Sequence, residues 1–302
     1  MINRVTRDRI DSLAKQYAQL LRDKPEAVRL VALAEIPEMV YNSNAIENST
    51  LTLQDTEDIL LRNRIKRDHD VREIYEAKNL AKITEMLLDN PEKTITPESI
   101  LELHKILLSG IHDNWAGRFR SGREWVRVGG HVGANPDFVE QLVKELLVDY
   151  KKQDDLYFLE KIAWFHAESE SIHPVNDGNG RLGRVLINQQ LQALGLPPII
   201  IQNRSKRTSY YPAFDVYRET AAADEFTKLF AGLLIESLYK RITLLSAPKA
   251  IPLTDWAEKN KVQLTIALNK AARGTLPAFR LRENWVIAAD YKPEASISSQ
   301  KS

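Results

Sequence analysis

Residues 173–184 constrain the fold of this chain more than any other stretch. They read His-Pro-Val-Asn-Asp-Gly-Asn-Gly-Arg-Leu-Gly-Arg. Pro174 lacks an N–H and disfavours helical dihedrals in the residue before it, so the helical pattern upstream should end near Ile172. A second helical pattern follows the stretch, and Gly195 with two prolines shortly after it predicts where that helix ends. The pattern therefore predicts a loop between two helices, with His173 at its head.

The polar residues of this loop predict a phosphate site. Residues 177–180 read Asp-Gly-Asn-Gly, and the glycines allow successive backbone N–H groups to converge on one anion. The positive end of the following helix faces the same loop. Arg181 and Arg184 are neighbours on its first turn, where guanidiniums can bind phosphate oxygens, and Asp177 offers the hard oxygen that Mg²⁺ prefers. A packing-only origin would require all these groups to gather at one helix start by coincidence.

The stretch resembles the signature of the Fic-domain family (filamentation induced by cAMP), which is usually written His-Pro-Phe-x-Asp-Gly-Asn-Gly-Arg-x-x-Arg. Every polar position of the signature is filled. Val175 replaces the usual Phe, an apolar anchor of the loop, so the loop should be slightly looser without losing a chemical group. The resemblance covers roughly residues 71–245 and implies a mainly α fold, a Fic helical bundle with a small β-hairpin flap.

The resemblance also implies an activity, transfer of AMP from ATP to a Ser, Thr or Tyr hydroxyl of a target protein. His173 would be the general base, since an imidazole titrates near physiological pH. Asp177 would hold Mg²⁺ across the phosphates. The residues implied to bind ATP are Asp177, Gly178, Asn179, Gly180, Arg181, Arg184, Tyr210 and Tyr211. Two alternatives stay open: removal of AMP at the same site, and a DNA-binding regulator with a vestigial Fic core. Phosphate or phosphocholine transfer occurs in the wider family, but this loop resembles its AMP-transferring branch.

A second motif lies N-terminal to the core. Ser43 and Glu47 are four residues apart, on one face of a helical pattern, and Asn48 follows. By spacing alone they form a helix C-terminal turn with a solvated glutamate. In one class of Fic proteins, however, Ser/Thr-x-x-x-Glu-Gly/Asn marks an inhibitory helix. Its glutamate pairs with the second signature arginine, here Arg184, and takes the space of the ATP γ-phosphate. The resemblance therefore implies self-inhibition within one chain, or, in the alternative of AMP removal, a Glu47 that orients water.

Residues 115–132 interrupt the helical pattern with glycines and a short apolar alternation, which predicts a hairpin. It matches the position of the family's flap, whose strand edge holds an extended target segment. The residues expected to dock the target are Val126, Arg127, Val128 and Gly129. Three histidines are not spaced with carboxylates as metal ligands would be, so a structural or exposed position is expected for His104, His112 and His131.

Helical patterns also cover residues 71–88, 98–108 and 225–245, and another helix should begin at residues 209–212. That start carries Tyr210 and Tyr211. Two adjacent tyrosines usually place one ring in the core and one in solvent. In the resembling family, a tyrosine pair at this distance helps to wall the adenine pocket.

The pattern changes after residue 245. Residues 247–252 read as a linker, and two short helices, from residue 253 and over 264–272, precede two strands about an Arg-Glu-Asn turn. This arrangement resembles the winged helix-turn-helix modules of the excisionase and MerR type, whose second helix enters the DNA major groove. Residues 251–302 carry eight Lys or Arg against five Asp or Glu, a weak surplus for phosphate neutralisation. DNA and a protein partner are both open for this small α+β module.

The whole chain has 302 residues and is 43% hydrophobic, enough for about two packed domains. The expected boundaries are an N-terminal helical segment with the inhibitory motif over 1–70, a catalytic core over 71–248 and the module over 249–302. A net charge of +1 gives no whole-chain case for nucleic acid or anionic membrane. The absence of cysteine excludes disulfides and Cys-based zinc sites. We expect a cytoplasmic protein without a membrane segment; a homodimer is open.

Overall fold

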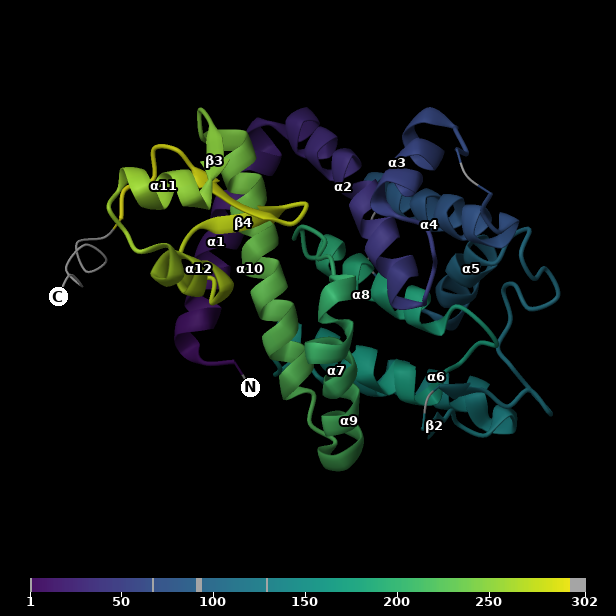
Figure 1. The fold of residues 1–302 in the computed structure, drawn as a ribbon. Helices are drawn as coiled ribbons and strands as arrows, with labels where there is room; N and C mark the ends of the chain where they lie inside the picture. The colour runs from purple at the N-terminus through teal and green to yellow at the C-terminus, as the bar shows by residue number, and fades with distance from the viewer. Residues whose placement is uncertain (1, 67, 91–93, 129, 294–302) are drawn as a thin grey trace. The chain divides into compact units, whose positions relative to one another are not determined.

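The computed structural model describes residues 2–66, 68–90, 94–128 and 130–293 (Figure 1). These residues form helices for most of their length, with one two-stranded and one three-stranded antiparallel sheet. The predicted mainly α fold is confirmed. None of the helices in the described ranges combines the length and the apolar composition needed to cross a bilayer.

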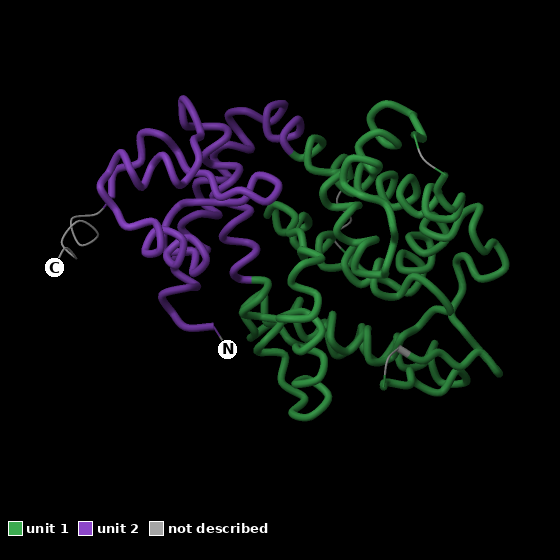
Figure 2. Tube along the Cα trace, in the orientation of Figure 1, with its two compact units in different colours: residues 1, 32–230 green, residues 2–31, 231–302 purple. Residues whose placement is uncertain are grey.

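Two compact units make up the chain, residues 32–230 and a second unit of residues 2–31 with 231–302 (Figure 2). This division differs from the expected boundaries at residues 70 and 248. The reason lies in contacts of α1 (Arg4–Asp23) and the segment that follows it: Arg9 donates a hydrogen bond to the Gly274 carbonyl (3.0 Å), and Lys24 donates one to the Leu245 carbonyl (2.6 Å). The first helix thus packs with the C-terminal elements, and α2 (Pro25–Ile46) and α10 (Asp224–Ser246) each contribute to both units.

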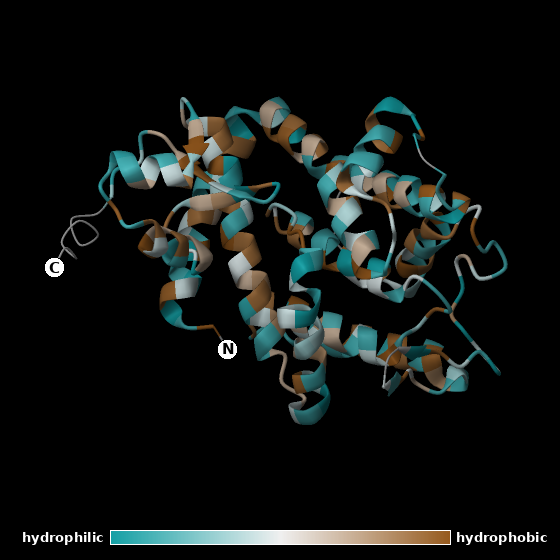
Figure 3. Cartoon of the chain, in the orientation of Figure 1, coloured by the Kyte–Doolittle hydropathy of each residue, from teal (hydrophilic) through white to brown (hydrophobic). Residues whose placement is uncertain are grey.

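The unit of residues 32–230 is a helical bundle with a hairpin inserted between α5 and α6. Besides parts of α2 and α10, its elements are α3 (Leu53–Arg62), α4 (Val71–Asp89), α5 (Pro97–Leu107), β1 (Arg127–Val128), β2 (His131–Val132), η1 (Pro136–Phe138), α6 (Val139–Lys152), α7 (Phe158–Ile172), α8 (Asn179–Ala193), η2 (Asn203–Ser205), η3 (Lys206–Tyr210) and α9 (Tyr211–Thr220). The buried apolar residues of α2 to α8 meet in one core, and Figure 3 shows hydrophobic and hydrophilic positions following one another along the helices. Capping boxes at Thr52 and Thr96 fix the starts of α3 and α5.

The signature loop joins α7 to α8 where the sequence predicts it. His173 ends α7 in the left-handed conformation (φ 56°) and its N–H donates to the Ser169 carbonyl at 2.9 Å. Val175 is fully buried in the core of the unit, so it still anchors the loop as the larger Phe would. The Asn179 side chain brackets Val175 by hydrogen bonds to its N–H (2.9 Å) and its carbonyl (2.7 Å). The loop is therefore held by packing on one side and by an amide clamp on the other.

The second unit contains α1, part of α10 and the C-terminal module. The module consists of β3 (Ala250–Pro252), α11 (Leu253–Lys259), α12 (Leu264–Ala272), β4 (Ala278–Leu281) and β5 (Asn284–Ala288). Its sheet has the order β3-β5-β4. The prediction of a linker over 247–252 is wrong in its second half, because Ala250–Pro252 pairs with β5 and Ile251 packs on the core formed around Trp256. The predicted short helices and the two strands about Arg282 are confirmed.

Candidate functional site

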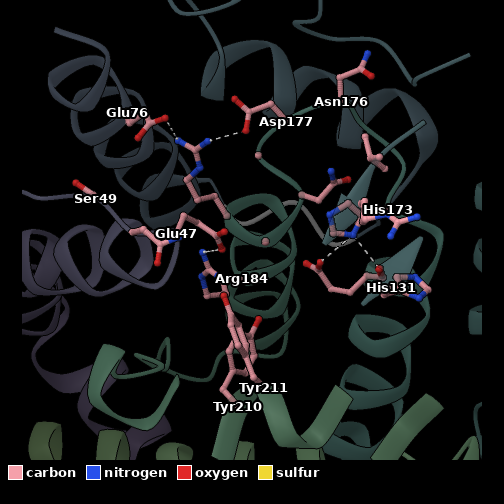
Figure 4. Close-up of a pocket in the computed structure, with 18 of the residues that line it drawn as sticks. Glu47, Ser49, Glu76, His131, His173, Asn176, Asp177, Arg184, Tyr210 and Tyr211 are labelled. Atoms are coloured by element: carbon pink, nitrogen blue, oxygen red, sulfur yellow. Dashed lines mark hydrogen bonds and ion pairs between the residues drawn. The ribbon is translucent and has the colours of Figure 1, made fainter. Parts of the chain in front are cut away.

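A cavity of about 850 Å³ opens over the signature loop within the unit of residues 32–230 (Figure 4). Its walls come from the end of α2, the start of α4, the hairpin, the end of α7, the start of α8, and η3 with α9. Every residue predicted to bind ATP lines it, and so do His173 and Glu47. The fold therefore brings together groups that lie up to 171 positions apart in the printed sequence.

His173 is placed as a base with one free nitrogen. Its Nδ1 lies 2.9 Å from the backbone carbonyl of Glu170, which can only accept, so the hydrogen bond requires a proton on Nδ1. In the neutral ring Nε2 is then the unprotonated nitrogen. The guanidinium of Arg120, itself buried, donates to the His173 carbonyl at 2.6 Å and fixes the backbone. Burial lowers the pKa of His173, which favours the neutral, proton-accepting form at physiological pH.

The start of α8 forms an open cradle for an anion. Gly178, at φ 84°, is the N-cap residue, and no side chain caps the helix or places an acid in its first turn. The first N–H groups of α8 and its positive end are thus available to a ligand. A Cβ built on Gly180 would collide with the Glu47 carboxylate, so Gly180 is the point where the helix comes closest to the inhibitory motif. Phosphate and the Glu47 side chain cannot both lie there.

Arg181 and Arg184 face different partners. Arg181, nearly fully buried, contacts Glu76 on α4 at 2.9 Å and Asp177 at 3.3 Å. Arg184 donates from Nε to the Ser43 hydroxyl (2.9 Å), and from Nη2 to the Ser43 carbonyl (2.9 Å) and the Glu47 carboxylate (2.8 Å). Burial alone would lower the pKa of Arg184, but the Glu47 carboxylate raises it above its ordinary value. The second arginine is therefore tied to the N-terminal motif.

The motif of residues 43–48 closes α2. Ser43 is buried behind Arg184, whereas the Glu47 side chain is 36% exposed at the cavity wall. Asn48 adopts the left-handed conformation (φ 69°) that follows many helix ends and accepts a hydrogen bond from Lys206 at 2.8 Å. This positive φ explains why the pattern has Gly or Asn at this position, because other residues rarely adopt such a conformation.

The tyrosine pair divides as predicted into one buried and one exposed ring. Tyr210 is 1% exposed and hydrogen-bonds through its hydroxyl to His166 Nε2 at 2.9 Å, and burial raises its pKa above the ordinary value. Its ring lies 6.0 Å from the Arg184 guanidinium. Tyr211 is 37% exposed, and Lys206 lies over its ring at 5.2 Å. Both rings line the cavity below Arg184 (Figure 4).

The predicted hairpin is confirmed as β1 and β2, paired antiparallel. Val126 and Arg127 line the cavity near His173, and the backbone of Val128 completes β1. Gly129 lies outside the described residues. His104, expected to be structural, is buried beneath the loop: its Nδ1 accepts from the Gly117 N–H and its Nε2 lies 3.1 Å from the Asp177 carbonyl.

Three residues that line the cavity, Arg72, Glu76 and Glu170, are missing from the sequence-based prediction. Arg72 on α4 donates to the Asp177 carboxylate at 2.6 Å and to Glu76 at 2.9 Å. Glu170 places Oε2 3.6 Å from His173 Nδ1, and burial raises the pKa of this acid to about 8. Spacing carried a signal in both cases, since Arg72 and Glu76 are four apart and Glu170 and His173 three apart on helices.

Comparison with known proteins finds similarity in the part of the chain that contains the signature loop. Residues 94–191 match the sequence model of the Fic/DOC family. The chain is 33% identical over 177 residues to a protein adenylyltransferase Fic of Nematostella vectensis, a match that covers 57% of this chain and 41% of that protein. It is 31% identical over 218 residues to one of Aedes aegypti, covering 70% and 42%. The chain thus spans less than half the length of these relatives.

Solved structures agree with the fold. A Fic domain containing signaling protein from Bacteroides thetaiotaomicron superposes with a TM-score of 0.69 at 26% identity, over 78% of this chain and 96% of that one. A Fic family protein from Desulfovibrio desulfuricans superposes with a TM-score of 0.66 over 97% and 98%; at 22% identity this likeness concerns the fold alone.

Proposed function

We propose that this chain, whose residues 94–191 match the Fic/DOC family model, is an ATP-dependent nucleotidyltransferase that transfers AMP to a Ser, Thr or Tyr hydroxyl of a target protein. One observation carries the proposal. His173, with its unprotonated Nε2, lines the same cavity as the uncapped start of α8 and the two signature arginines. A base and an anion cradle in one cavity are the two parts that attack of a hydroxyl on a phosphate requires.

The proposed reaction is an in-line displacement at the α-phosphorus of ATP. The target hydroxyl oxygen forms a bond to the α-phosphorus of ATP, its proton passes to His173 Nε2, and the bond between the α-phosphorus and the bridging oxygen breaks to release pyrophosphate. The N–H groups of α8 and the guanidiniums of Arg181 and Arg184 stabilise the phosphoryl charge. This fixed array should supply the larger part of the acceleration, and the base a factor of about 10² to 10⁴.

The residues at Asp177 fit a magnesium ion. In the described ranges no three His, Asp or Glu side chains converge as a preformed metal cage. Mg²⁺ needs less, since it usually takes one or two carboxylates together with substrate phosphates, and Asp177 offers a carboxylate at the phosphate side of the cavity. Bound there, the ion would neutralise phosphate charge. Asp177 would hold it, in competition with Arg72 and Arg181, which contact its two oxygens.

We further propose that Glu47 inhibits this activity. Its carboxylate occupies the approach to Gly180 and neutralises Arg184, the cation that would receive the γ-phosphate. When Glu47 withdraws, Arg184 is free to bind the nucleotide. A second candidate activity is removal of AMP from a modified target, favoured by the partly exposed Glu47 carboxylate, which could orient a water in the cavity that holds His173.

The decisive experiment incubates the Glu47→Gly protein with a cell lysate and ATP labelled at either the α- or the γ-phosphate. Label should reach a protein only from the α-position, and capture of that protein names the target. Transfer from the γ-position would instead indicate phosphate transfer. Release of AMP from a pre-labelled target by the unaltered protein would support the second candidate.

The C-terminal module carries a separate proposal. Its two helices and three-stranded sheet are arranged in the order expected of a winged helix-turn-helix, and α12 exposes Leu264 and Leu268 beside polar residues. DNA and a protein partner both fit such a surface. A gel-shift assay with the full chain on random duplexes at low salt separates them, because the absence of retardation on any duplex would eliminate the DNA proposal.

A further inference from the structure

The hairpin segment exposes two arginines about a tryptophan. Arg123, Trp125 and Arg127 are all exposed, and Trp125 keeps 57% of its surface in solvent. Within the described part of the chain, neither arginine side chain forms an ion pair. We call these three residues the Arg-Trp-Arg face. Trp and Arg are among the residues that contribute most binding energy at protein interfaces. An exposed tryptophan between two arginines without ion pairs, beside a cavity, therefore indicates a binding surface.

An ion pair between Arg118 and Glu124 holds this face in one orientation. The guanidinium of Arg118 binds both oxygens of Glu124, at 2.8 and 2.6 Å, and the Ser121 N–H donates to the same carboxylate at 2.8 Å. Arg118 lowers the pKa of Glu124 to about 2, so the ion pair persists at physiological pH. The backbone N–H of Trp125 also donates to the Arg123 carbonyl at 2.9 Å. Because Glu124 is used by Arg118, its charge does not neutralise the two exposed arginines.

The same segment ends in a free strand edge. The Gly133 N–H donates to the Val126 carbonyl at 3.1 Å, and antiparallel pairs alternate between bonded and non-bonded positions. Arg127, opposite Val132, is therefore in a non-bonded pair, and its N–H and carbonyl point away from β2. β2 is attached on its other side, where the Ala134 N–H donates to the Ile172 carbonyl at 3.1 Å. Within the described residues of the hairpin, the β1 edge is left to accept a further strand.

We propose that the Arg-Trp-Arg face selects the target: it binds an extended protein segment that carries acidic residues, with an apolar residue near them, beside the hydroxyl to be modified. The inference rests on the proposed AMP transfer and specifies its substrate class. Arg127 lines the cavity of His173, so a segment paired with its backbone passes the base. Opposite charge steers such a segment to the edge, and Trp125 supplies the apolar contact.

Charge and an aromatic ring would also suit a single-stranded nucleic acid. The strand edge favours protein, because the outward N–H and carbonyl of Arg127 match the main chain of an extended peptide. A nucleic acid has no equivalent of that main-chain ladder. The two occupants therefore differ in a measurable way: a peptide should compete with the target, and an oligonucleotide should not.

The test uses the Glu47→Gly full chain, α-labelled ATP and three sets of synthetic peptides that share a central Thr in an extended apolar core. The sets differ only in flanking residues: acidic, neutral or basic. Labelling of the acidic set should exceed the neutral set about tenfold in kcat/KM, the order expected of two exposed ion pairs, and the basic set should be the poorest. Raised salt should reduce the preference, since the arginines are in solvent.

Matched variants assign the preference to the face. Arg123→Glu combined with Arg127→Glu should reverse the order of the acidic and basic sets, and Trp125→Ala should raise KM for all three. Lys151→Glu, at an exposed position of α6, reverses a positive charge elsewhere and should keep the acidic preference. Peptide binding is measured in parallel by fluorescence anisotropy, which does not depend on AMP transfer.

Equal labelling and equal binding of the three sets would overturn the proposal. So would stronger competition by a single-stranded oligonucleotide than by the acidic peptides. Acidic preference in binding without any labelling would keep the docking surface and refute the proposed transfer. Peptide binding thus tests the docking surface, and peptide labelling tests the transfer of AMP.

Discussion

Replacing Glu47 should release the nucleotide site. The Glu47 carboxylate lies 2.8 Å from Arg184 and against Gly180, where the terminal phosphate of ATP would have to lie. Glu47→Gly removes the charge, the hydrogen bond and the side-chain volume at once. Ser43 continues to hold Arg184 through two hydrogen bonds, so the arginine remains oriented toward the cavity.

The size of the effect follows from the burial of the pair. A hydrogen bond between charged groups contributes about 1.5–3 kcal/mol. Arg184 is 7% exposed but Glu47 is 36% exposed, so solvent screens the pair and the lower half of that range applies. Because about 1.4 kcal/mol corresponds to a factor of ten, the Glu47→Gly protein should bind ATP roughly 10- to 40-fold more tightly than the unaltered protein.

Isothermal titration calorimetry with a non-hydrolysable ATP analogue and Mg²⁺ measures this directly. Glu47→Gln separates charge from volume: it retains a side chain of the same size and should give an intermediate affinity. Glu102→Gln, an exposed position on α5, removes one negative charge elsewhere and should leave the affinity unchanged. Equal dissociation constants for the Glu47→Gly, Glu47→Gln and unaltered proteins would refute the argument that Glu47 competes with nucleotide.

Two further predictions concern the carboxylates of the cavity. Asp177→Asn should abolish the Mg²⁺-dependent part of ATP binding; if added Mg²⁺ tightens binding equally in both proteins, Asp177 does not hold the ion. Glu170 has a folded-state pKa raised from 4.5 to about 8, so its burial costs stability increasingly as pH rises between those values. Glu170→Gln should therefore gain in melting temperature over the unaltered protein from pH 5 to pH 8, and a difference that does not change with pH would contradict this assignment.

Local signals explain what the sequence could predict. The end of α7 follows from Pro174, and the loop follows from its glycines, because these residues act through their own backbone. The division of the tyrosine pair is likewise a property of two neighbouring positions, at the junction of η3 and α9. Most of the named site residues reach the cavity for this reason: twelve consecutive residues contain the base, the cradle and both arginines.

Other features depend on partners distant in the sequence. β3 is a strand only because β5 lies beside it, with Ile251 opposite Ile287, and its Pro252 reads locally as a linker. Arg72 reaches Asp177 across 105 positions, a contact that no pattern in α4 announces. The second unit joins α1 to the C-terminal module for the same reason. α6 is a different case. The sequence analysis does not predict this helix, although its buried Val139, Val143, Leu146 and Leu147 have helical spacing that could have identified it.

The most direct test of the proposed transfer is the loss of AMP attachment when the base is removed. The Glu47→Gly protein and the same protein with His173→Ala are incubated with ATP, Mg²⁺ and the captured target, and the target is examined by intact-mass spectrometry. The account predicts a gain of one AMP moiety on the target with the first protein and none with the second, although both bind the ATP analogue. An equal AMP gain with His173→Ala would contradict the central role of His173.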